Sequence, residues 1–416
     1  MNTNYLILGA GISGLSCAAK LRGEDYLVLE RENEIGGYCR TIRQNGFVWD
    51  YAGHFFHFSN PAIQAEFSGL LHGGDSVFQK KCTKIFYNGQ YIDYPFQYNI
   101  HQLEKEEFVD CLTGLYYRPA GPVCTFQEML YAKFGAGIAN KFLIPYNSKL
   151  YACNLNHLDM NAMGRFFPYA EPEEIIRGFR KHQKETYNDT FYYSSRGAEA
   201  FVQKIAENVD RSQVLCGTDV QSIDLAQKYV RTPNGTIHYQ HLINTIPFPR
   251  FLQLARIQTA AAFTCNQVLV FNLGFDLPAI DPSIHWIYYP DPAVCFYRVG
   301  FYNNILRQSL MSLYVELGFP EDAHIDVSHW RETVLQDLKK TGIVKDHQLI
   351  AENSILMNPA YVHIREESNR EKEIIKSALR EQQVYTIGRY GDWTYCSIED
   401  CILQAYQTIA EIRGEV

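Results

Sequence analysis

The N-terminal thirty residues alternate between short apolar runs and a pattern with helical spacing. Residues 4–9 predict a buried strand, 12–21 predict a helix, and the run YLVLE at 26–30 predicts a second strand. Strand, helix and strand in this order form a βαβ unit, whose strands are parallel and whose crossover is right-handed. The N-terminal part is therefore expected to form an α/β layer.

The central part of the chain has other periodicities. Residues 84–94 alternate apolar and polar positions around an Asn-Gly pair at 88–89, which is typical of a hairpin with a type I′ turn. Residues 100–180 have a mostly helical pattern. Val, Phe, Tyr and Leu are frequent over 263–317, which indicates several strands of a second sheet, and 328–341 predict an amphipathic helix.

The same periodicities predict further elements around a central α/β layer. They are a helix over 196–209, strands over 214–225, 229–239 and 241–247, a strand over 384–389 and a helix over 399–413. The last two return the chain to the N-terminal layer, so both parts of the sequence are expected to build it.

Composition and charge narrow the class of protein. The chain has 416 residues, of which 46% are hydrophobic and 20% are charged, as in a folded globular enzyme. The formal net charge is −8 and no basic run occurs, which argues against nucleic acid or an anionic membrane as a partner. Eleven cysteines occur singly without a Cys-x-x-Cys pair, which is typical of reduced intracellular proteins without a zinc site.

We recognise no signal peptide and no membrane-spanning segment in the sequence. The N-terminal apolar run has no basic flank and is interrupted by glycines, so it is not expected to be a signal peptide. No apolar run reaches the roughly 20 residues that span a bilayer. We expect a cytoplasmic protein without a transmembrane segment or a metal site, and the sequence leaves its oligomeric state open.

A glycine motif follows the first predicted strand. Gly9, Gly11 and Gly14 fit G-x-G-x-x-G, in which the glycines allow a tight turn, a close approach of pyrophosphate and close helix–strand packing. Glu30 closes the second strand about 20 residues later, where an acid can bind both ribose hydroxyls. This spacing predicts a dinucleotide cofactor.

The stretch ERENEIGGYCRT at 30–41 extends this motif. Gly36 and Gly37 allow a second close approach of backbone to the cofactor, and Arg40 can place a cation beside the pyrophosphate. The extended arrangement resembles the flavin-binding fingerprint of the superfamily that contains amine oxidases, protoporphyrinogen oxidases and UDP-galactopyranose mutases. The resemblance implies FAD, with these cofactor-binding residues: Gly9, Gly11, Gly14, Glu30, Arg31, Gly36, Gly37, Arg40, Thr41, Val220, Gly388, Arg389, Ser397 and Ile398.

The resemblance also implies a division of the chain. The expected fold class is α/β, with a Rossmann-type FAD-binding domain, an inserted helical part and a mostly antiparallel β-sheet substrate domain. The FAD-binding domain is discontinuous and the other regions are inserted into it. The expected parts are 1–80 with 190–250 and 345–416 for FAD binding, 81–189 for a hairpin and helical cap, and 251–344 for the antiparallel sheet.

Four segments resemble the UDP-galactopyranose mutase branch, in order and over nearly the whole chain. They are GFVWDYAGHFFHF (46–58), KIFYNGQYIDYPFQYNIHQL (84–103), FLIPYNSKLYACNLNHLDM (142–160) and IGRYGDWTYCSIEDCILQA (387–405). The family chemistry uses reduced FAD, which attacks the anomeric carbon of the sugar through N5, displaces UDP and allows pyranose and furanose to interconvert through a flavin–sugar adduct. NADPH or NADH would be the external reductant.

The resemblance assigns site residues by position. The catalytic set is His54, Arg298, Tyr361 and Tyr395, and the substrate-binding set is Tyr146, Tyr151, Arg298, Tyr361 and Tyr395. Arg298 lies in an apolar strand, where an unpaired cation is costly, so it requires an anionic partner, either a ligand or a carboxylate. A helix that begins near Ser397 would point its positive end at the flavin pyrimidine. Each tyrosine could equally be a core residue, because the chain has 29 of them.

The sequence departs from the mutase pattern at four positions. Thr190 stands in place of a second diphosphate-binding arginine, and Glu199 in place of a tyrosine. Ser397 replaces an aspartate and Tyr151 replaces a tryptophan. Arg196 or Arg180 could supply the missing charge. A nucleotide-sugar isomerase remains the first hypothesis, a flavin oxidoreductase of the amine oxidase or protoporphyrinogen oxidase type the second, and a non-catalytic FAD-binding protein the third.

Overall fold

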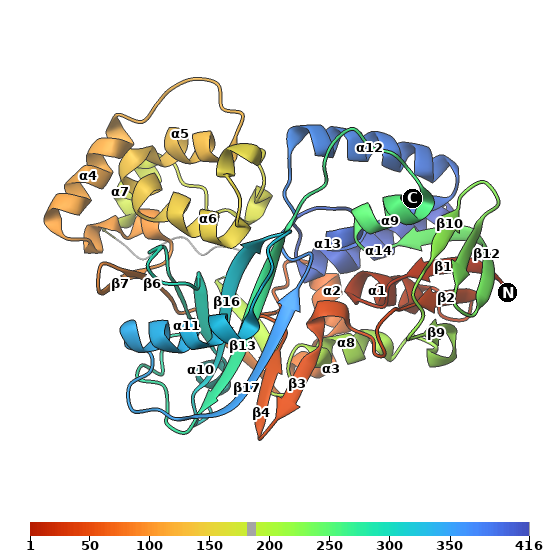
Figure 1. The fold of residues 1–416 in the computed structure, drawn as a ribbon, viewed down its shortest axis with the longest axis horizontal. Coiled ribbons are helices and arrows are strands. Elements are labelled where there is room, and N and C mark those ends of the chain that lie inside the picture. The colour runs from red at the N-terminus through yellow and green to blue at the C-terminus, as the bar shows by residue number, and fades with distance from the viewer. Residues whose placement is uncertain (181–188, 416) are drawn as a thin grey trace.

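Two large β-sheets organise the molecule, as the computed structural model shows for residues 1–180 and 189–415 (Figure 1). The predicted region 81–189 thus includes residues 181–188, which lie outside the described ones. The N- and C-terminal ends both lie in the lobe on the right of Figure 1. The predicted α/β layer built from both ends of the chain is confirmed.

The first sheet contains the predicted βαβ unit. It consists of β1 (Asn2–Leu8), β2 (Tyr26–Leu29), β9 (Val214–Leu215), β10 (Ser222–Asp224), β11 (Tyr229–Thr232), β12 (Gly235–Asn244) and β18 (Val384–Thr386). The order is β10-β11-β12-β1-β2-β9, and β18 also pairs with β12. β1 and β2 are parallel, with Tyr5 opposite Tyr26, and α1 (Ile12–Lys20) connects them.

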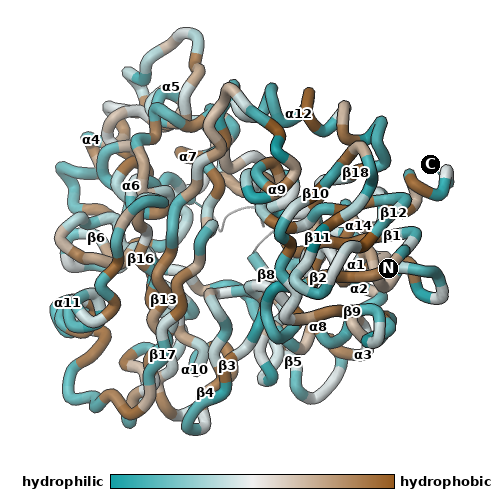
Figure 2. The backbone as a smooth tube through the Cα atoms, turned by 45° about the vertical axis from the view of Figure 1, so that its right-hand side comes forward, coloured by the Kyte–Doolittle hydropathy of each residue, from teal (hydrophilic) through white to brown (hydrophobic). Residues whose placement is uncertain are grey.

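Helices cover both faces of the first sheet, namely α8 (Glu199–Ala206), α9 (Phe248–Ala255), α12 (Glu366–Glu381) and α14 (Ile398–Arg413) in addition to α1. Side chains alternate between the two faces along each strand. Ile7 and Val28 point to one face and pack against α1, α8 and α14, whereas Leu6 and Leu8 point to the other and pack with α9 and α12. Figure 2 shows hydrophobic residues along β1 and β2.

The second sheet is antiparallel except where β14 pairs with β6. Its order is β17-β13-β16-β15-β14-β6-β7. The strands are β6 (Thr83–Tyr87), β7 (Gln90–Asp93), β13 (Asn266–Phe275), β14 (Trp286–Tyr288), β15 (Arg298–Phe301), β16 (Ser312–Pro320) and β17 (Leu349–Met357). All residues of β13 are buried. Its alternate side chains pack towards α11 (Val327–Lys340) on one face and towards the helical part on the other.

The helical part covers the second sheet on the left of Figure 1. Its helices are α4 (Lys105–Tyr116), α5 (Phe126–Ile138), α6 (Ile144–Tyr151) and α7 (Pro172–Gly178). Smaller elements complete the described chain: α2 (Pro61–Glu66), α3 (Ser68–Leu71), α10 (Tyr302–Leu306), α13 (Gly388–Gly391), β3 (Thr41–Gln44) with β4 (Phe47–Asp50), and β5 (Ser76–Lys80) with β8 (Thr190–Ser194). Across the described ranges, none of the helices has the length and apolar character that crossing a bilayer requires.

Two elements of the structure have bounds that differ from those predicted from the sequence. The predicted strand 241–247 is the second half of β12, which starts at Gly235 and ends at Asn244, because one continuous strand pairs first with β11 and then with β18. The predicted helix 196–209 begins only at Glu199, because Gly197 has a φ of 79°, outside the helical region.

Two segments pair differently from the expected division of the chain. Residues 349–357 form β17, which pairs with β13 along its length and so belongs to the second sheet rather than to the nucleotide-binding layer. The predicted hairpin at 84–94 forms as β6 and β7, and its pairing with β14 makes it the edge of the same sheet. The remaining boundaries of the expected parts stay a prediction.

Asp50 connects the two halves of the molecule from a fully buried position. Its carboxylate accepts hydrogen bonds from the Thr41 hydroxyl (2.6 Å), the Tyr193 hydroxyl (2.8 Å) and the Ala198 backbone N–H (2.9 Å). Its carbonyl accepts one from Asn272 of β13 at 2.9 Å. Burial raises the pKa of Asp50 to about 6, although these hydrogen bonds lower it.

The raised pKa predicts how Asp50→Asn changes stability with pH. The native state holds a proton on Asp50 up to about pH 6, whereas the unfolded state holds it only up to about pH 4. Because the native state binds the extra proton between these two values, the free energy of unfolding of the wild type falls as the pH rises from about 4 to about 6. The stability of the wild type relative to D50N should fall by up to roughly 3 kcal/mol over that window. Urea unfolding of both proteins at either end of the window measures this. Asp346→Asn, at an exposed residue, is the control, and an identical wild-type-to-D50N difference at both ends contradicts the prediction.

Candidate functional site

The turn between β1 and α1 leaves backbone donors available. Gly9 has a φ of 97°, and a Cβ on Gly14 would lie 1.9 Å from the Gly9 carbonyl oxygen, so this turn requires glycine at both positions. α1 begins at Ile12 after Gly11, and no side chain caps its first turn. Its first N–H groups can therefore bind an anion such as a pyrophosphate.

A second glycine loop lies directly against the first. The Gly36 N–H donates to the Ala10 carbonyl at 2.8 Å. A Cβ on Gly37 would lie 3.3 Å from the Gly11 Cα, and Gly36 and Gly37 both have positive φ values. The two glycine pairs thus bring two stretches of backbone close together beside the N-terminus of α1, which is the cradle that the fingerprint predicts.

Glu30 is buried at the end of β2 and holds this arrangement in place. Its Oε2 accepts from the Ala10 N–H at 2.7 Å, and its Oε1 accepts from the Glu32 N–H at 3.0 Å. Each oxygen of a carboxylate can accept a further hydrogen bond, so Glu30 can still bind ribose hydroxyls. That contact stays a prediction.

The other predicted residues of this region lie in different surroundings. Arg40 lies at the cradle, where its Nε donates to the Gly37 carbonyl at 2.9 Å and its guanidinium lies 4.9 Å from the centre of the Tyr51 ring. Arg31 is exposed and pairs with Glu32. Thr41 donates to Asp50, and Val220 is buried in the core beneath the first sheet. Direct roles of these residues in cofactor binding stay a prediction.

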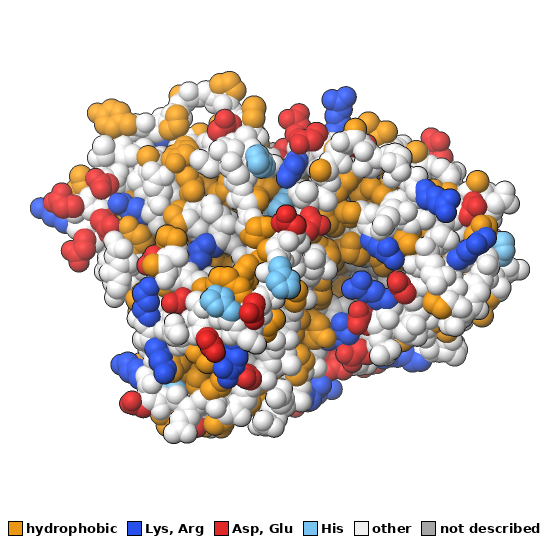
Figure 3. Space-filling model, viewed as in Figure 1, with side chains coloured by type: hydrophobic (Ala, Val, Ile, Leu, Met, Phe, Trp, Pro, Cys, Tyr) orange, Lys and Arg blue, Asp and Glu red, His pale blue; other side chains and the backbone are white. Residues whose placement is uncertain are grey.

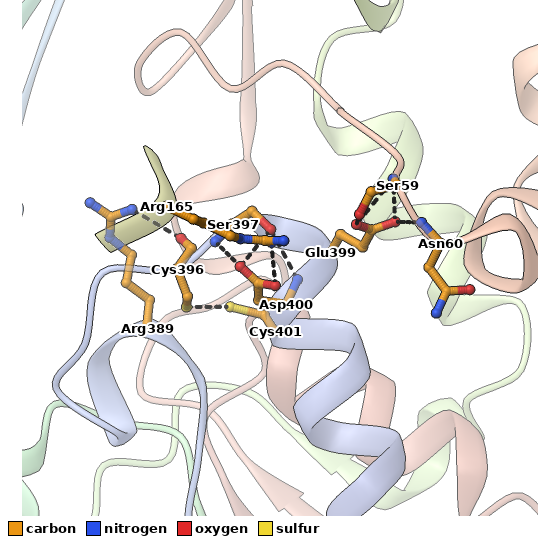
Figure 4. Close-up of polar contacts among 9 residues, drawn as sticks. All are labelled: Ser59, Asn60, Arg165, Arg389, Cys396, Ser397, Glu399, Asp400 and Cys401. Atoms are coloured by element: carbon orange, nitrogen blue, oxygen red, sulfur yellow. Dashed lines mark hydrogen bonds and ion pairs between the residues drawn. The ribbon is translucent and has the colours of Figure 1, made fainter. Parts of the chain in front are cut away.

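The C-terminal segment meets the same cradle. Gly388 has a φ of 80°, and a Cβ there would lie 2.2 Å from the Ser13 Oγ, so it packs on the first turn of α1. The Arg389 guanidinium lies 4.6 Å from the centre of the Tyr395 ring and 5.3 Å from that of Tyr361. Its Nη1 donates to the Cys396 carbonyl at 3.3 Å (Figure 4), while its Nε is buried without a partner among the described residues.

Helix α14 begins where the sequence predicted. Ser397 caps it, accepting from the Asp400 N–H, and the Asp400 carboxylate accepts from the Ser397 N–H in return, as Figure 4 shows. Ile398 is the first helical residue. Glu399 is buried and accepts from the backbone N–H groups of Ser59 and Asn60, so this acid fixes a neighbouring loop. Whether the helix faces a flavin stays a prediction.

The predicted substrate tyrosines form two groups. The Tyr361 ring is stacked on Tyr395 with centroids 5.9 Å apart and lies edge-on to Tyr151, also at 5.9 Å. The hydroxyl of Tyr151 is buried and has no partner in the described part of the chain. Tyr146 packs instead against Tyr288, with centroids 4.9 Å apart. Figure 3 shows hydrophobic side chains along the boundary between the two lobes.

Arg298 has a carboxylate partner that sequence reasoning did not identify. Its Nε and Nη2 both donate to Glu316 at 2.7 Å, a bidentate pair in which the Glu316 side chain is only 1% exposed. The two residues are directly opposite on β15 and β16. The pair has no net charge, so Arg298 could still donate from Nη1 to an anion but would neutralise it less than a free arginine would.

His54 lies close enough to Arg389 and Arg298 for their positive charges to act on its imidazole. Burial, together with the positive charges of Arg389 and Arg298, lowers the pKa of His54 to about 3. Its Nδ1 is buried and makes no hydrogen bond to any described residue. The imidazole is therefore neutral at physiological pH and can act as a donor or acceptor but not as a cation.

Two of the departures from the mutase pattern, Thr190 and Glu199, have partners other than Arg298. Thr190 is in β8, where its carbonyl contacts His57 Nδ1 at 2.8 Å, and Glu199 pairs with Arg43 at 2.8 Å. Arg196 lies 3.5 Å from Asp75 in an exposed ion pair. Arg180 lines a separate cavity of about 610 Å³ beside α7. Among the described contacts, none brings Arg196 or Arg180 to Arg298.

These features fit a bound flavin dinucleotide. Side chains at Gly11 and Gly37 would fill the space where the two loops of the cradle approach each other. Arg389 and two residues within reach of its charge have buried polar groups without a partner in the described ranges, namely Arg389 Nε, His54 Nδ1 and the Tyr151 hydroxyl. Buried polar groups in native proteins are nearly always paired, so a polar ligand is expected to satisfy them.

Comparisons with known proteins identify the class of fold first. A family model described as an NAD(P)-binding Rossmann-like domain matches residues 7–70. Protoporphyrinogen oxidase 2 of Arabidopsis thaliana is 37% identical over 59 residues, 14% of this chain and 12% of the relative. The chain thus matches only a small part of this relative's own length. A Rossmann-type dinucleotide-binding domain is confirmed.

The comparison with solved structures is more extensive. The crystal structure of a reduced UDP-galactopyranose mutase superposes with a TM-score of 0.92 at 22% identity, covering 100% of this chain and 95% of that one. The UDP-galactopyranose mutase of Mycoplasma pneumoniae is 23% identical over 199 residues, 42% of this chain and 49% of the relative. The chain therefore has the fold of that mutase, and the predicted resemblance is confirmed at the level of the fold.

Gly11→Ala tests the cradle with little risk to the fold. A Cβ at Gly11 would meet a single atom, the Gly37 Cα at 4.0 Å, so the protein should fold normally while the methyl group occupies space between the loops. We expect FAD to bind about tenfold more weakly or worse, about 1.4 kcal/mol, as measured by flavin fluorescence titration. Gly69→Ala, whose Cβ would meet nothing within 4 Å, is the matched control. Equal affinities of G11A and the wild type would show that the cradle does not hold the cofactor.

Proposed function

We propose that this protein is an FAD-dependent isomerase that interconverts the pyranose and furanose forms of a nucleotide sugar of the UDP-galactose class. The observation that carries the proposal is the superposition of the whole chain on a UDP-galactopyranose mutase. The aromatic cluster around Arg389 and Arg298, at positions assigned to substrate by sequence, supports it further.

The cofactor site is proposed to act mainly by position and charge. Gly11 and Gly37 admit the pyrophosphate, Arg40 adds a cation beside it, and Glu30 holds the ribose. Bound in its reduced form, FAD would supply a nucleophile for the anomeric carbon, with UDP as the leaving group. Arg389 and the N-terminus of α14 would add positive potential that stabilises the negative charge of a reduced ring. NADPH or NADH is the proposed reductant, and the cytoplasm the proposed compartment.

The substrate groups are proposed to hold the leaving diphosphate and the sugar. Tyr361 and Tyr395, stacked on each other, can donate from their hydroxyls to phosphate oxygens, and Tyr151 offers a buried hydroxyl without a partner among the described residues. Arg298, held by Glu316, can donate its remaining N–H groups. Neutral His54 can orient a sugar hydroxyl without adding charge. Tyr146 is proposed to contact the nucleotide.

A flavin oxidoreductase of the protoporphyrinogen oxidase or amine oxidase type is the second candidate. The neutral Arg298–Glu316 pair favours it, because a diphosphate site with Thr190 in place of its second arginine lacks a net positive clamp. The segment similar to protoporphyrinogen oxidase 2 is consistent with it but lies in the cofactor domain shared by both candidates.

Incubation with both substrate classes separates the two candidates. The reduced protein should convert UDP-galactofuranose to UDP-galactopyranose without consuming stoichiometric reductant, since the flavin is regenerated in each cycle. Anaerobic product analysis by ion-exchange chromatography measures this, and the oxidised protein is the control. Oxygen consumption with an amine or a porphyrinogen, together with no sugar isomerisation, would overturn the proposal in favour of the oxidoreductase.

A double substitution tests Arg298 without leaving its partner charged and buried. Arg298→Ala alone would strand Glu316, which costs about 3–5 kcal/mol and confuses folding with binding. Arg298→Met with Glu316→Gln removes both charges and should weaken UDP binding to the reduced protein by about 10- to 100-fold, since a hydrogen bond to a charged group contributes about 1.5–3 kcal/mol.

The matched control for this double variant is Arg331→Met with Glu352→Gln. These residues form another Arg–Glu pair near the second sheet, at 2.5 Å, and both are more than a third exposed. Isothermal titration with UDP should give wild-type affinity for this control. UDP affinity that stays unchanged in R298M/E316Q would exclude Arg298 from the substrate site.

A further inference from the structure

Two cysteines lie in contact beside the proposed flavin site. The Sγ atoms of Cys396 and Cys401 are 3.6 Å apart and both residues are buried, as Figure 4 shows. Cys396 precedes the cap of α14, and Cys401 lies in the first turns of that helix. All eleven cysteines are within the described ranges, and this is the one sulfur–sulfur hydrogen-bond contact between them.

The surroundings of this pair favour one negative charge. The Cys396 thiol donates to Cys401 and lowers the pKa of the Cys401 thiol, against burial, which raises it. The Ser13 hydroxyl, the Arg389 backbone N–H and the Arg389 charge lower it further. The N-terminal end of α14 adds positive potential. The two sulfurs are thus expected to share one proton.

Small molecules can reach the pair from one side. Cys396 lines a cavity of about 480 Å³ together with Tyr395, Arg165 and Asp400. Cys17, by contrast, is buried between α1 and α14, where its thiol donates to the Ala405 carbonyl at 4.0 Å. An oxidant that enters the cavity therefore meets Cys396, whose sulfur has a second sulfur in contact.

We propose that Cys396 and Cys401 form a redox-active pair that hydrogen peroxide oxidises to an intramolecular disulfide. With the shared proton on Cys396, the Cys401 thiolate attacks one peroxide oxygen, the O–O bond breaks and hydroxide leaves. The Cys396 sulfur then attacks the resulting sulfenic acid, the S–S bond forms, the S–O bond breaks, and water leaves with the proton of Cys396. The two sulfurs lose two electrons, and the peroxide becomes water and hydroxide.

Oxidation of this pair reaches the substrate groups through Arg389. An S–S bond of about 2.0 Å requires the two sulfurs to approach, which moves the turn at 396 towards α14. The carbonyl of Cys396 accepts from Arg389, and Tyr395 is its neighbour in sequence. The effect of the disulfide on the substrate groups rests on the proposed function. The disulfide should lower the affinity of the protein for UDP about tenfold, because it displaces hydrogen bonds to the charged diphosphate of UDP.

Peptide mass mapping tests the site directly. Trypsin releases residues 390–413 as one peptide, whose only cysteines are Cys396 and Cys401. After treatment of the flavin-loaded protein with hydrogen peroxide and alkylation, this peptide should lose two hydrogen atoms, take up no alkylating agent, and recover two free thiols with dithiothreitol. Free thiols of the whole chain should fall from eleven to nine before exposed cysteines react.

Variants and an internal reference keep this test decisive. Cys396→Ser and Cys401→Ser should each abolish the mass change, and Cys17→Ala, a buried cysteine against the same helix, should retain it. The exposed Cys124 reports that the oxidant is active. Oxidation of Cys124 while residues 390–413 keep both thiols, or carry a sulfinic acid without the S–S bond, overturns the proposal.

A UDP titration of the reduced and disulfide forms tests the link to the substrate. Affinity about tenfold weaker in the disulfide form, restored by dithiothreitol and constant in peroxide-treated Cys401→Ser, supports it. Equally tight binding in both forms overturns the link through Arg389. A failure of both forms to bind UDP contradicts the proposed function instead, and leaves the mapped disulfide standing.

Discussion

The molecule depends on the close approach of two backbone loops at the peptide of Ala10. Its N–H is bound by Glu30 and its carbonyl accepts from Gly36, so one residue joins the end of β2, the turn before α1 and the second glycine loop. Neither Gly11 nor Gly37 could bear a large side chain in this arrangement. Because Gly388 packs on Ser13 from the other side, the C-terminal segment is fixed against the same turn.

The distribution of positive charge distinguishes the two parts of the site. Arg389 is held by a single carbonyl and two aromatic rings and has a buried N–H without a partner in the described chain, which suits it to a ligand. Arg298 instead donates two hydrogen bonds from one edge of its guanidinium to Glu316. The proposed flavin site would therefore be stabilised strongly by positive charge, and the proposed diphosphate site only weakly. Substrate affinity would then depend largely on tyrosine hydroxyls.

Local signals in the sequence were sufficient for the cofactor layer but not for the site that faces it. The glycines and Glu30 are identifiable because each must meet a backbone constraint within about 30 residues. Glu316 could not be paired with Arg298, because strand register depends on tertiary contacts. α12 and α9 were missed. α12 is mostly charged and buries few apolar residues, so its periodicity is weak. β17 was misassigned because its partner β13 lies more than 70 residues away in the chain.

Hydrogen exchange during a titration with FAD tests most directly whether both ends of the chain enclose one flavin. The account predicts that backbone amides at 10–15, 36–40 and 388–398 become protected together, with one common midpoint at one FAD per chain. Protection of the N-terminal loops alone would contradict it, because Gly388 and Arg389 would then lie outside the cofactor site. A protein that binds no FAD would contradict the account entirely.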